Sequence, residues 1–149
     1  MAEGMEIDEQ PPPARRPVTS TTDSDPECPE RELTQRIIGC AIEVHKTLGP
    51  GFKEGIYENA MIHELTRQGL AVNNQRVIQV FYKGTRVGWH RIDLVVEEKV
   101  IIELKHVETI LKKHMAQTIS TLKAAGLRVG LLINFNETRL MDGLRRVVV

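Results

Sequence analysis

Apolar residues recur every three or four positions in two segments of the first half of the chain. The first segment predicts a helix from about Leu33 to Leu48, with Thr34 near its start as a cap and the glycines of GPG (residues 49–51) as its end. The second predicts a helix from about Lys53 to Gly69. The positions that define the two stripes are Ile37, Ala41, Val44 and Leu48, and then Tyr57, Met61 and Leu65. Two helices are therefore expected before the first strand.

Beyond these helices the apolar period changes toward two, which is typical of strands. The pattern predicts strands over Val77–Tyr82 and Val87–Val96, joined by KGT, whose Gly84 suits a hairpin turn. A second turn at EEK (residues 97–99) leads into a third strand over Val100–Lys105. The three strands are thus expected to form an antiparallel meander.

The remaining sequence returns to a helix and then to a strand. Residues 109–125 predict a helix ended by Gly126, and Leu127–Phe135 is a short apolar run of the kind buried on both faces of a sheet. The predicted order is α-α-β-β-β-α-β. A meander, a crossover helix and a strand parallel to its neighbour make a mixed sheet flanked by helices, so the expected fold class is α/β, built as an α+β sandwich.

The first thirty residues differ in composition from the rest. They are rich in Pro, Ser, Thr and acidic residues and have no apolar period, so we predict a disordered tail over residues 1–30 and one folded domain over residues 31–149. The tail contains eight acidic and two basic residues, which leaves twelve acidic and eighteen basic residues in the domain. This basic domain is compatible with a polyanionic partner, although many enzymes carry as much positive charge.

The chain shows neither a secretion signal nor an apolar run long enough to cross a membrane. The cytoplasm, without membrane association, is therefore the expected location. Cys28 and Cys40 are too few for a disulfide framework and lack the spacing of metal ligands.

Two charged side chains interrupt the third predicted strand, within the sequence IIELK. Glu103 and Lys105 are two positions apart and therefore project from the same face of the strand. If residues 97–99 form a three-residue loop, the hairpin register places Asp93 opposite Glu103. A loop of two or four residues would instead put the two carboxylates on opposite faces. The candidate site thus depends on the length of this turn.

In the three-residue register, Asp93 and Glu103 provide two hard oxygen ligands with Lys105 beside them. Mg²⁺ prefers such ligands and leaves positions for water and substrate phosphate. A lysine beside the metal can position or deprotonate an attacking water and offset charge in the transition state. The alternative is a solvated strand face, with Glu103 and Lys105 as a neighbouring ion pair worth less than about 1 kcal/mol. Spacing alone favours this alternative, because D-x9-E-x-K is a loose pattern.

Longer stretches of the sequence resemble a known family. The spacing Asp93…Glu103-Leu104-Lys105, after a helix that carries an acid and before a helix and a strand, resembles the PD-(D/E)XK nuclease superfamily.

A more specific resemblance lies in the sequence LGPGFKEGIYENAM. It is similar to the signature of the GxxExxY protein family, whose name is matched by Gly51, Glu54 and Tyr57. This similarity covers about residues 33–149, through VHKTLGPG, RIDLVVEEKVIIELK and AQTISTLKAAGLRVGLLINF. Together these resemblances imply a restriction-endonuclease-like core.

The resemblance also implies a role for each matching position. Asp93 and Glu103 would be ligands of Mg²⁺ or Mn²⁺, with the backbone carbonyl of Leu104 as a further ligand. Lys105 would be the catalytic lysine, and Glu54 the auxiliary acid from the preceding helices.

Other positions complete or qualify this implied site. Gln117 matches the polar residue on the following helix that often completes such sites, and Gly51 and Tyr57 would support it. Tyr57 is equally well interpreted as a partly buried core residue. Ile92 stands where the superfamily name has a proline, which weakens the match only slightly because that position varies.

The implied activity is metal-dependent hydrolysis of nucleic-acid phosphodiester bonds, with DNA expected ahead of RNA. The alternative is a non-catalytic module that keeps the nuclease fold for nucleic-acid or protein binding. Because the chain has no separate DNA-reading domain, we expect low sequence specificity, a homodimer, or a partner protein that delivers the substrate. Phe81 and Trp89 could stack on bases, although hydrophobic packing is the commoner role, and His45 is interpreted as a structural histidine.

Overall fold

The computed structural model describes residues 28–149, so the tail predicted over residues 1–30 lies outside the described residues apart from its last three positions. Helix α2 (Arg31–Leu48) and helix α3 (Glu54–Arg67) follow one another, close to the predicted bounds. Their apolar stripes are buried, as predicted.

The start of α2 differs from the prediction. Thr34 was expected to cap the helix, but it lies within the first turn and is buried. Its hydroxyl donates to the backbone carbonyls of Glu30 and Arg31. The helix therefore begins three residues before the predicted cap, and Thr34 is part of its buried face.

Five strands form one mixed sheet in the order β1-β2-β3-β4-β5. Strands β3 and β4 are parallel, and the other neighbours are antiparallel. The strands are β1 (Val72–Tyr82), β2 (Thr85–Val96), β3 (Val100–Lys105), β4 (Val129–Asn134) and β5 (Leu144–Val148). The predicted mixed sheet is confirmed, but β1 starts five residues earlier than expected. Strand β5 and the short 3₁₀ helix η1 (Leu140–Gly143) before it were not predicted.

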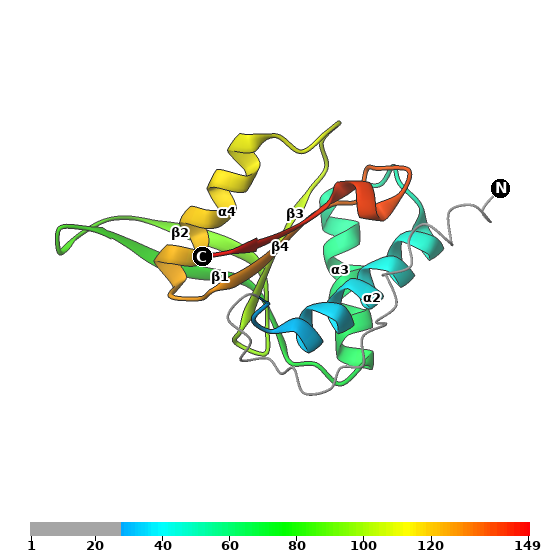
Figure 1. Cartoon of the computed structure of the whole chain (residues 1–149), viewed down its shortest axis with the longest axis horizontal. Helices are drawn as coiled ribbons and strands as arrows, with labels where there is room; N and C mark the ends of the chain where they lie inside the picture. Colours follow the sequence, from blue (N-terminus) through cyan, green and yellow to red (C-terminus); the bar gives the residue numbers. More distant parts are fainter. Residues whose placement is uncertain (1–27) are drawn as a thin grey trace.

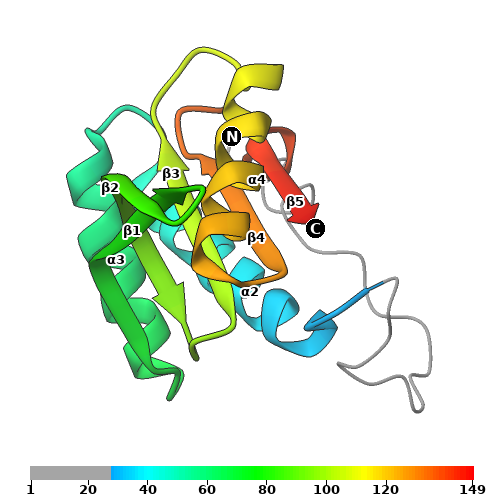
Figure 2. The same ribbon diagram turned by 90° about the vertical axis from the view of Figure 1, so that its left-hand side faces the viewer.

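Helices cover both faces of the sheet (Figure 1, Figure 2). On one face, α2 and α3 enclose a core with residues of β3 and β4, including Val100, Ile102 and Leu131. On the other, α4 (Lys112–Ala125) packs Leu122 against Ile101 in a smaller core. The fold is thus an α+β sandwich, as the sequence predicted.

The turn between β2 and β3 has the three-residue form on which the site depends. Val96 pairs with Val100, so residues 97–99 form the loop. Glu97 and Glu98 both have positive φ angles, of 55° and 58°, in positions where glycine would be the ordinary choice. Backbone and side-chain bonds of Glu97 to Ala71 hold this conformation. The register is therefore fixed without a glycine.

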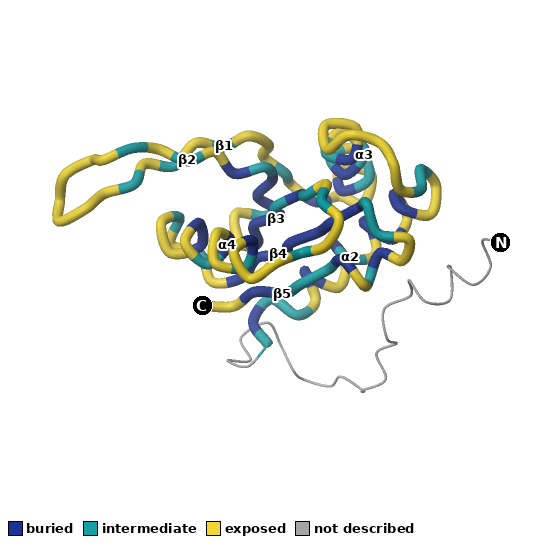
Figure 3. Tube along the Cα trace, turned by 90° about the horizontal axis from the view of Figure 1, so that it is seen from above, coloured by how far each residue is buried: buried dark blue, intermediate teal, exposed yellow. Residues whose placement is uncertain are grey.

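The β1–β2 hairpin extends well beyond β3 and projects from the rest of the domain (Figure 1, Figure 3). Pairing of β2 with β3 ends at Leu94 and Ile102, whereas pairing of β1 with β2 continues to Tyr82 and Thr85. The two sets of strands therefore part directly beside Asp93 and Glu103. Of the helices within residues 28–149, none is long and apolar enough to cross a membrane.

Candidate active site

Asp93 lies where β2 and β3 separate, and its side chain accepts a backbone hydrogen bond in place of the β-ladder. The ladder would have continued to Asp93 and Glu103, but it stops one pair earlier. Instead, the Leu104 backbone N–H donates to Asp93 Oδ2 at 2.8 Å. Burial raises the pKa of Asp93, this hydrogen bond opposes the increase, and the charge of Glu58 adds to it. The carboxylate is thus fixed in place but incompletely solvated.

Glu103 is the most perturbed carboxylate of the site. Its Oε2 atom is buried and has no hydrogen-bond partner among the described residues. Burial raises the pKa of Glu103 to about 8, and the charges of Asp93 and Glu54 act in the same direction, against the opposing effect of Lys105. This side chain is therefore not part of a solvated strand face.

Glu54 joins the group from the first residue of α3. Partial desolvation raises its pKa, and so does the charge of Asp93, while Lys105 and His106 act in the opposite direction. The backbone N–H of His106 also lowers the pKa of the Glu54 carboxyl. Helix α3 and the end of β3 are thereby connected at the site.

The loop before α3 explains how Glu54 comes to this place. Tyr57 is buried against Phe135, with ring centroids 4.6 Å apart. Its hydroxyl donates to the Gly49 carbonyl and accepts from the Phe52 backbone N–H at 3.1 Å. Gly51 lies within this loop with φ near 118°, which side-chain-bearing residues rarely adopt. Tyr57 is therefore a core residue that fixes the loop, and it supports the site indirectly.

Lys105 and Gln117 meet from β3 and α4. Lys105 Nζ donates to Gln117 Oε1 at 3.1 Å, which directs the ammonium group toward α4. Gln117 is on the helix that the sequence predicted for it. Its backbone carbonyl also accepts a bond from the Thr121 hydroxyl.

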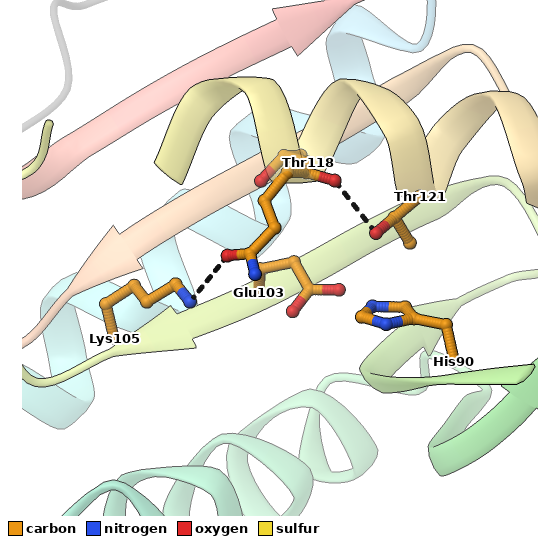
Figure 4. A pocket seen from close by; sticks show the side chains of 6 residues that line it. His90, Glu103, Lys105, Thr118 and Thr121 are labelled. Atoms are coloured by element: carbon orange, nitrogen blue, oxygen red, sulfur yellow. Dashed lines mark hydrogen bonds between the residues drawn. The ribbon is translucent and has the colours of Figure 1, made fainter. Parts of the chain in front are cut away.

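A small pocket of about 50 Å³ lies between β2, β3 and α4, lined by His90, Glu103, Lys105, Gln117, Thr118 and Thr121. Figure 4 shows the Glu103 carboxylate pointing toward the His90 imidazole. His90 Nε2 is also buried without a hydrogen-bond partner among the described residues. Two polar groups therefore face a pocket that has room for water or a small ion.

His90 was not identified from the sequence. The only signal was a polar ring in an otherwise apolar and basic strand, and strand alternation places it on the same face as Ile92. Ile92, at the position of the family's proline, is fully buried. His45, predicted to be structural, is buried and bonded to the Glu137 carbonyl at 2.8 Å.

The donor set is suited to a divalent cation. In residues 28–149, no group of three or more His, Cys, Asp or Glu side chains is arranged so that it could hold a metal ion. Mg²⁺ does not need one, because it is commonly held by one or two carboxylates and keeps several waters. The buried, unpartnered oxygen of Glu103 and the neighbouring charge of Asp93 are destabilising unless a positive group neutralises them. The residues therefore fit Mg²⁺ or Mn²⁺.

The structure thus brings together the side chains that the sequence singled out. Electrostatic coupling connects Glu54, Asp93, Glu103 and Lys105, and a hydrogen bond adds Gln117. Their roles remain predictions.

Comparison with known proteins gives the family. Residues 31–147 match the model of the PD-(D/E)XK nuclease superfamily. No curated protein and no solved structure matches the chain. Because this match spans most of the chain and includes every residue of the candidate site, the chain belongs to the PD-(D/E)XK nuclease superfamily.

Proposed function

We propose that this protein is a metal-dependent nuclease that hydrolyses phosphodiester bonds of nucleic acids. Membership of the superfamily indicates a nuclease-type function. The observation that carries the finer proposal is the buried, unpartnered carboxylate of Glu103, next to Asp93 and Glu54 and within reach of a lysine. Such a cluster destabilises a folded chain, and a site for a cation accounts for it.

In this proposal, Asp93 and Glu103 hold Mg²⁺ or Mn²⁺ together with the Leu104 backbone carbonyl. The cation supplies charge stabilisation at the phosphate and a more acidic bound water. Asp93 is oriented for this role by the Leu104 N–H, which occupies its Oδ2 atom from one side.

Lys105 acts on the reacting groups themselves. Gln117 holds its ammonium group, so that it can orient the attacking water and donate to a phosphate oxygen as negative charge builds there. The water oxygen would bond to phosphorus as the bond to the leaving oxygen breaks, the water would lose a proton to solvent, and the leaving oxygen would take up a proton from solvent. Glu54 completes the site as an auxiliary acid near Asp93.

A cleavage assay tests the proposal. Labelled single- and double-stranded DNA and RNA are incubated with the full chain in Mg²⁺, Mn²⁺ or EDTA, beside Lys105→Ala and Glu103→Gln. We expect metal-dependent products from the wild type and a loss of about 100-fold or more in each variant, because each removes an electrostatic contact to the transition state.

Lys123→Ala is the matched control, since Lys123 is an exposed lysine near the end of α4, away from the site residues. It should cut as the wild type does. Calorimetry then measures whether the wild type binds Mn²⁺ and whether Glu103→Gln abolishes that binding. The nuclease proposal is wrong if no substrate is cut and no such Glu103-dependent binding is found. A non-catalytic binding module would then be the better description.

A further inference from the structure

The projecting hairpin has one face that nothing in the described fold covers. Ile78 packs toward α4 with Ile92, and strand alternation turns the neighbouring positions of β1 the other way. We define the arm face as the exposed residues on that side of the β1–β2 hairpin, namely Val77, Gln79, Phe81, Arg86, Trp89 and Arg91. Figure 3 shows this hairpin extending away from the domain, with its outer part exposed.

The exposed aromatic rings of this hairpin are unusual for a surface strand. Phe81 is 61 % exposed and Trp89 is 55 % exposed, and Tyr82 at the tip is 62 % exposed. Contiguous exposed apolar groups of this kind mark interaction sites on soluble proteins. An unbound hairpin gains little from turning three rings toward water, so the arm face has the character of a binding surface.

The charge of the hairpin indicates the kind of partner. Between Val72 and Ile92 the sequence contains no Asp or Glu, although it contains three arginines and a lysine. Cations also lie over the rings: the Arg91 guanidinium is 5.5 Å from the Trp89 ring centre, and Lys83 Nζ is 5.4 Å from that of Tyr82. Arg76 is paired with Glu98, which leaves Lys83, Arg86 and Arg91 as the positive charges beside the rings. Rings combined with these charges favour a polyanion with flat bases over a second copy, whose arm would bring like charges together.

We propose that the arm face binds a single-stranded segment of nucleic acid, with Trp89 and Phe81 stacking on unpaired bases and Arg86 and Arg91 contacting phosphates. A duplex keeps its base faces stacked inside, so exposed rings can stack only on bases that are unpaired. The path of the bound nucleic acid rests on the proposed function. Arg91 precedes Asp93 by two residues on β2, so a segment bound along the arm face would lead to the candidate site.

The length of the arm sets the length of the bound segment. From Asp93 to Arg86 the strand covers seven steps of about 3.3 Å, or about 23 Å. At about 3.4 Å for each stacked nucleotide, this corresponds to about seven nucleotides. Affinity should therefore increase with oligonucleotide length up to about seven nucleotides and change little beyond it.

The experiment uses the full chain in EDTA, so that binding is measured whether or not the protein cuts. The probe is a fluorescently labelled twelve-nucleotide oligo(dT), with a duplex of the same length for comparison, and the readout is anisotropy. Trp89 is the sole tryptophan, so its emission reports on stacking directly. We expect oligo(dT) to quench Trp89 and to bind at least about 10-fold more weakly to Trp89→Ala.

Two variants separate stacking from general damage to the hairpin. Trp89→Phe keeps a ring and should retain most of the affinity. Thr85→Ala shortens an exposed side chain of the same hairpin that is not part of the arm face, and it should bind as the wild type does. Circular dichroism of all three variants should match the wild type, because the altered side chains are largely exposed.

Several outcomes would overturn the inference. These are unchanged Trp89 emission on binding, equal affinity of wild type and Trp89→Ala, and duplex binding as tight as oligo(dT) binding. A concentration-dependent dimer that Trp89→Ala dissociates would assign the face to a second copy instead. Oligo(dT) binding through Trp89, with no substrate cut and no Glu103-dependent binding of Mn²⁺, would refute the nuclease proposal and leave the arm inference standing.

Discussion

The destabilisation that results when the buried Glu103 carboxylate ionises gives the sharpest test of the site. In the metal-free protein, burial and the charges of Asp93 and Glu54 raise the pKa of Glu103 to about 8, from an ordinary value of 4.5. Between these two pH values the folded protein keeps a proton that the unfolded chain releases. The free energy of unfolding should therefore fall as the pH rises from about 4.5 to 8.

The size of this effect follows from the same pKa. At about 1.36 kcal/mol for each pH unit between the ordinary and the raised pKa, Glu103 would cost up to about 5 kcal/mol when fully ionised. Glu103→Gln has nearly the same shape and cannot ionise, so it should remove this cost. The variant should be close to the wild type at pH 5 and more stable at pH 9, by an amount up to that limit.

Urea unfolding of wild type and Glu103→Gln from pH 5 to pH 9 in EDTA measures the difference, with Glu108→Gln, at an exposed site, as control. Glu108→Gln should follow the wild type at every pH. Adding Mn²⁺ should stabilise the wild type at high pH and have less effect on Glu103→Gln. Parallel stability curves for wild type and Glu103→Gln across this range would refute the assignment of Glu103 as a buried, uncompensated carboxylate.

Three further predictions concern the fold. Gly143→Ala should lower the free energy of unfolding by about 2 kcal/mol, because a Cβ there would lie 2.6 Å from the Asn134 carbonyl oxygen. Gly39→Ala, on an exposed position of α2 with open space around it, should raise the free energy of unfolding by about 0.5–1 kcal/mol, and thermal denaturation of both variants compares them. Burial raises the pKa of the Cys40 thiol to about 11, with Glu64 acting in the same direction, so Cys40 should react with a thiol reagent at pH 8 far more slowly in the folded protein than in urea. Equal rates in the two states would contradict its burial, and the half-exposed Cys28 provides the internal reference.

The sequence left the register of the β2–β3 turn open between loops of two, three and four residues, because Leu94–Val96 and Val100–Ile102 are apolar and buried at every position and so do not distinguish the two faces. It also did not determine how the loop manages without glycine. Glu97 takes a left-handed conformation because its side chain and backbone both bond to Ala71, a residue 26 positions away. Local sequence contains no trace of such a contact.

The missed elements have a different cause. Residues 72–76 read VNNQR, without apolar alternation, and they become strand because β2 extends alongside them. Strand β5 contains Arg145 and Arg146, which break its apolar run, and it is a strand because it pairs with the fully buried β4. In both cases pairing with a strong neighbour overrides a weak local preference.

Residues of the candidate site could be predicted where they are related by their spacing in the sequence. They could not be predicted where only the packing of the folded chain brings them together. Glu103 and Lys105 follow from two-residue alternation, and Gln117 from family resemblance. His90 reaches the same pocket from a different part of the hairpin, because of the way that β2 passes over α4. Such a meeting of residues depends on the path of the backbone in three dimensions.

The bond from the Leu104 N–H to Asp93 has a consequence for mutational work. Where β2 and β3 separate, this carboxylate replaces a backbone hydrogen bond between the two strands. Replacing it with alanine would remove a chemical group and also loosen the junction, so lost activity in that variant would have two causes. Asparagine keeps an oxygen for the Leu104 N–H while removing the charge. At this position, an asparagine variant therefore reports on the loss of the charge alone, whereas an alanine variant also reports on the loss of the hydrogen bond that holds the two strands.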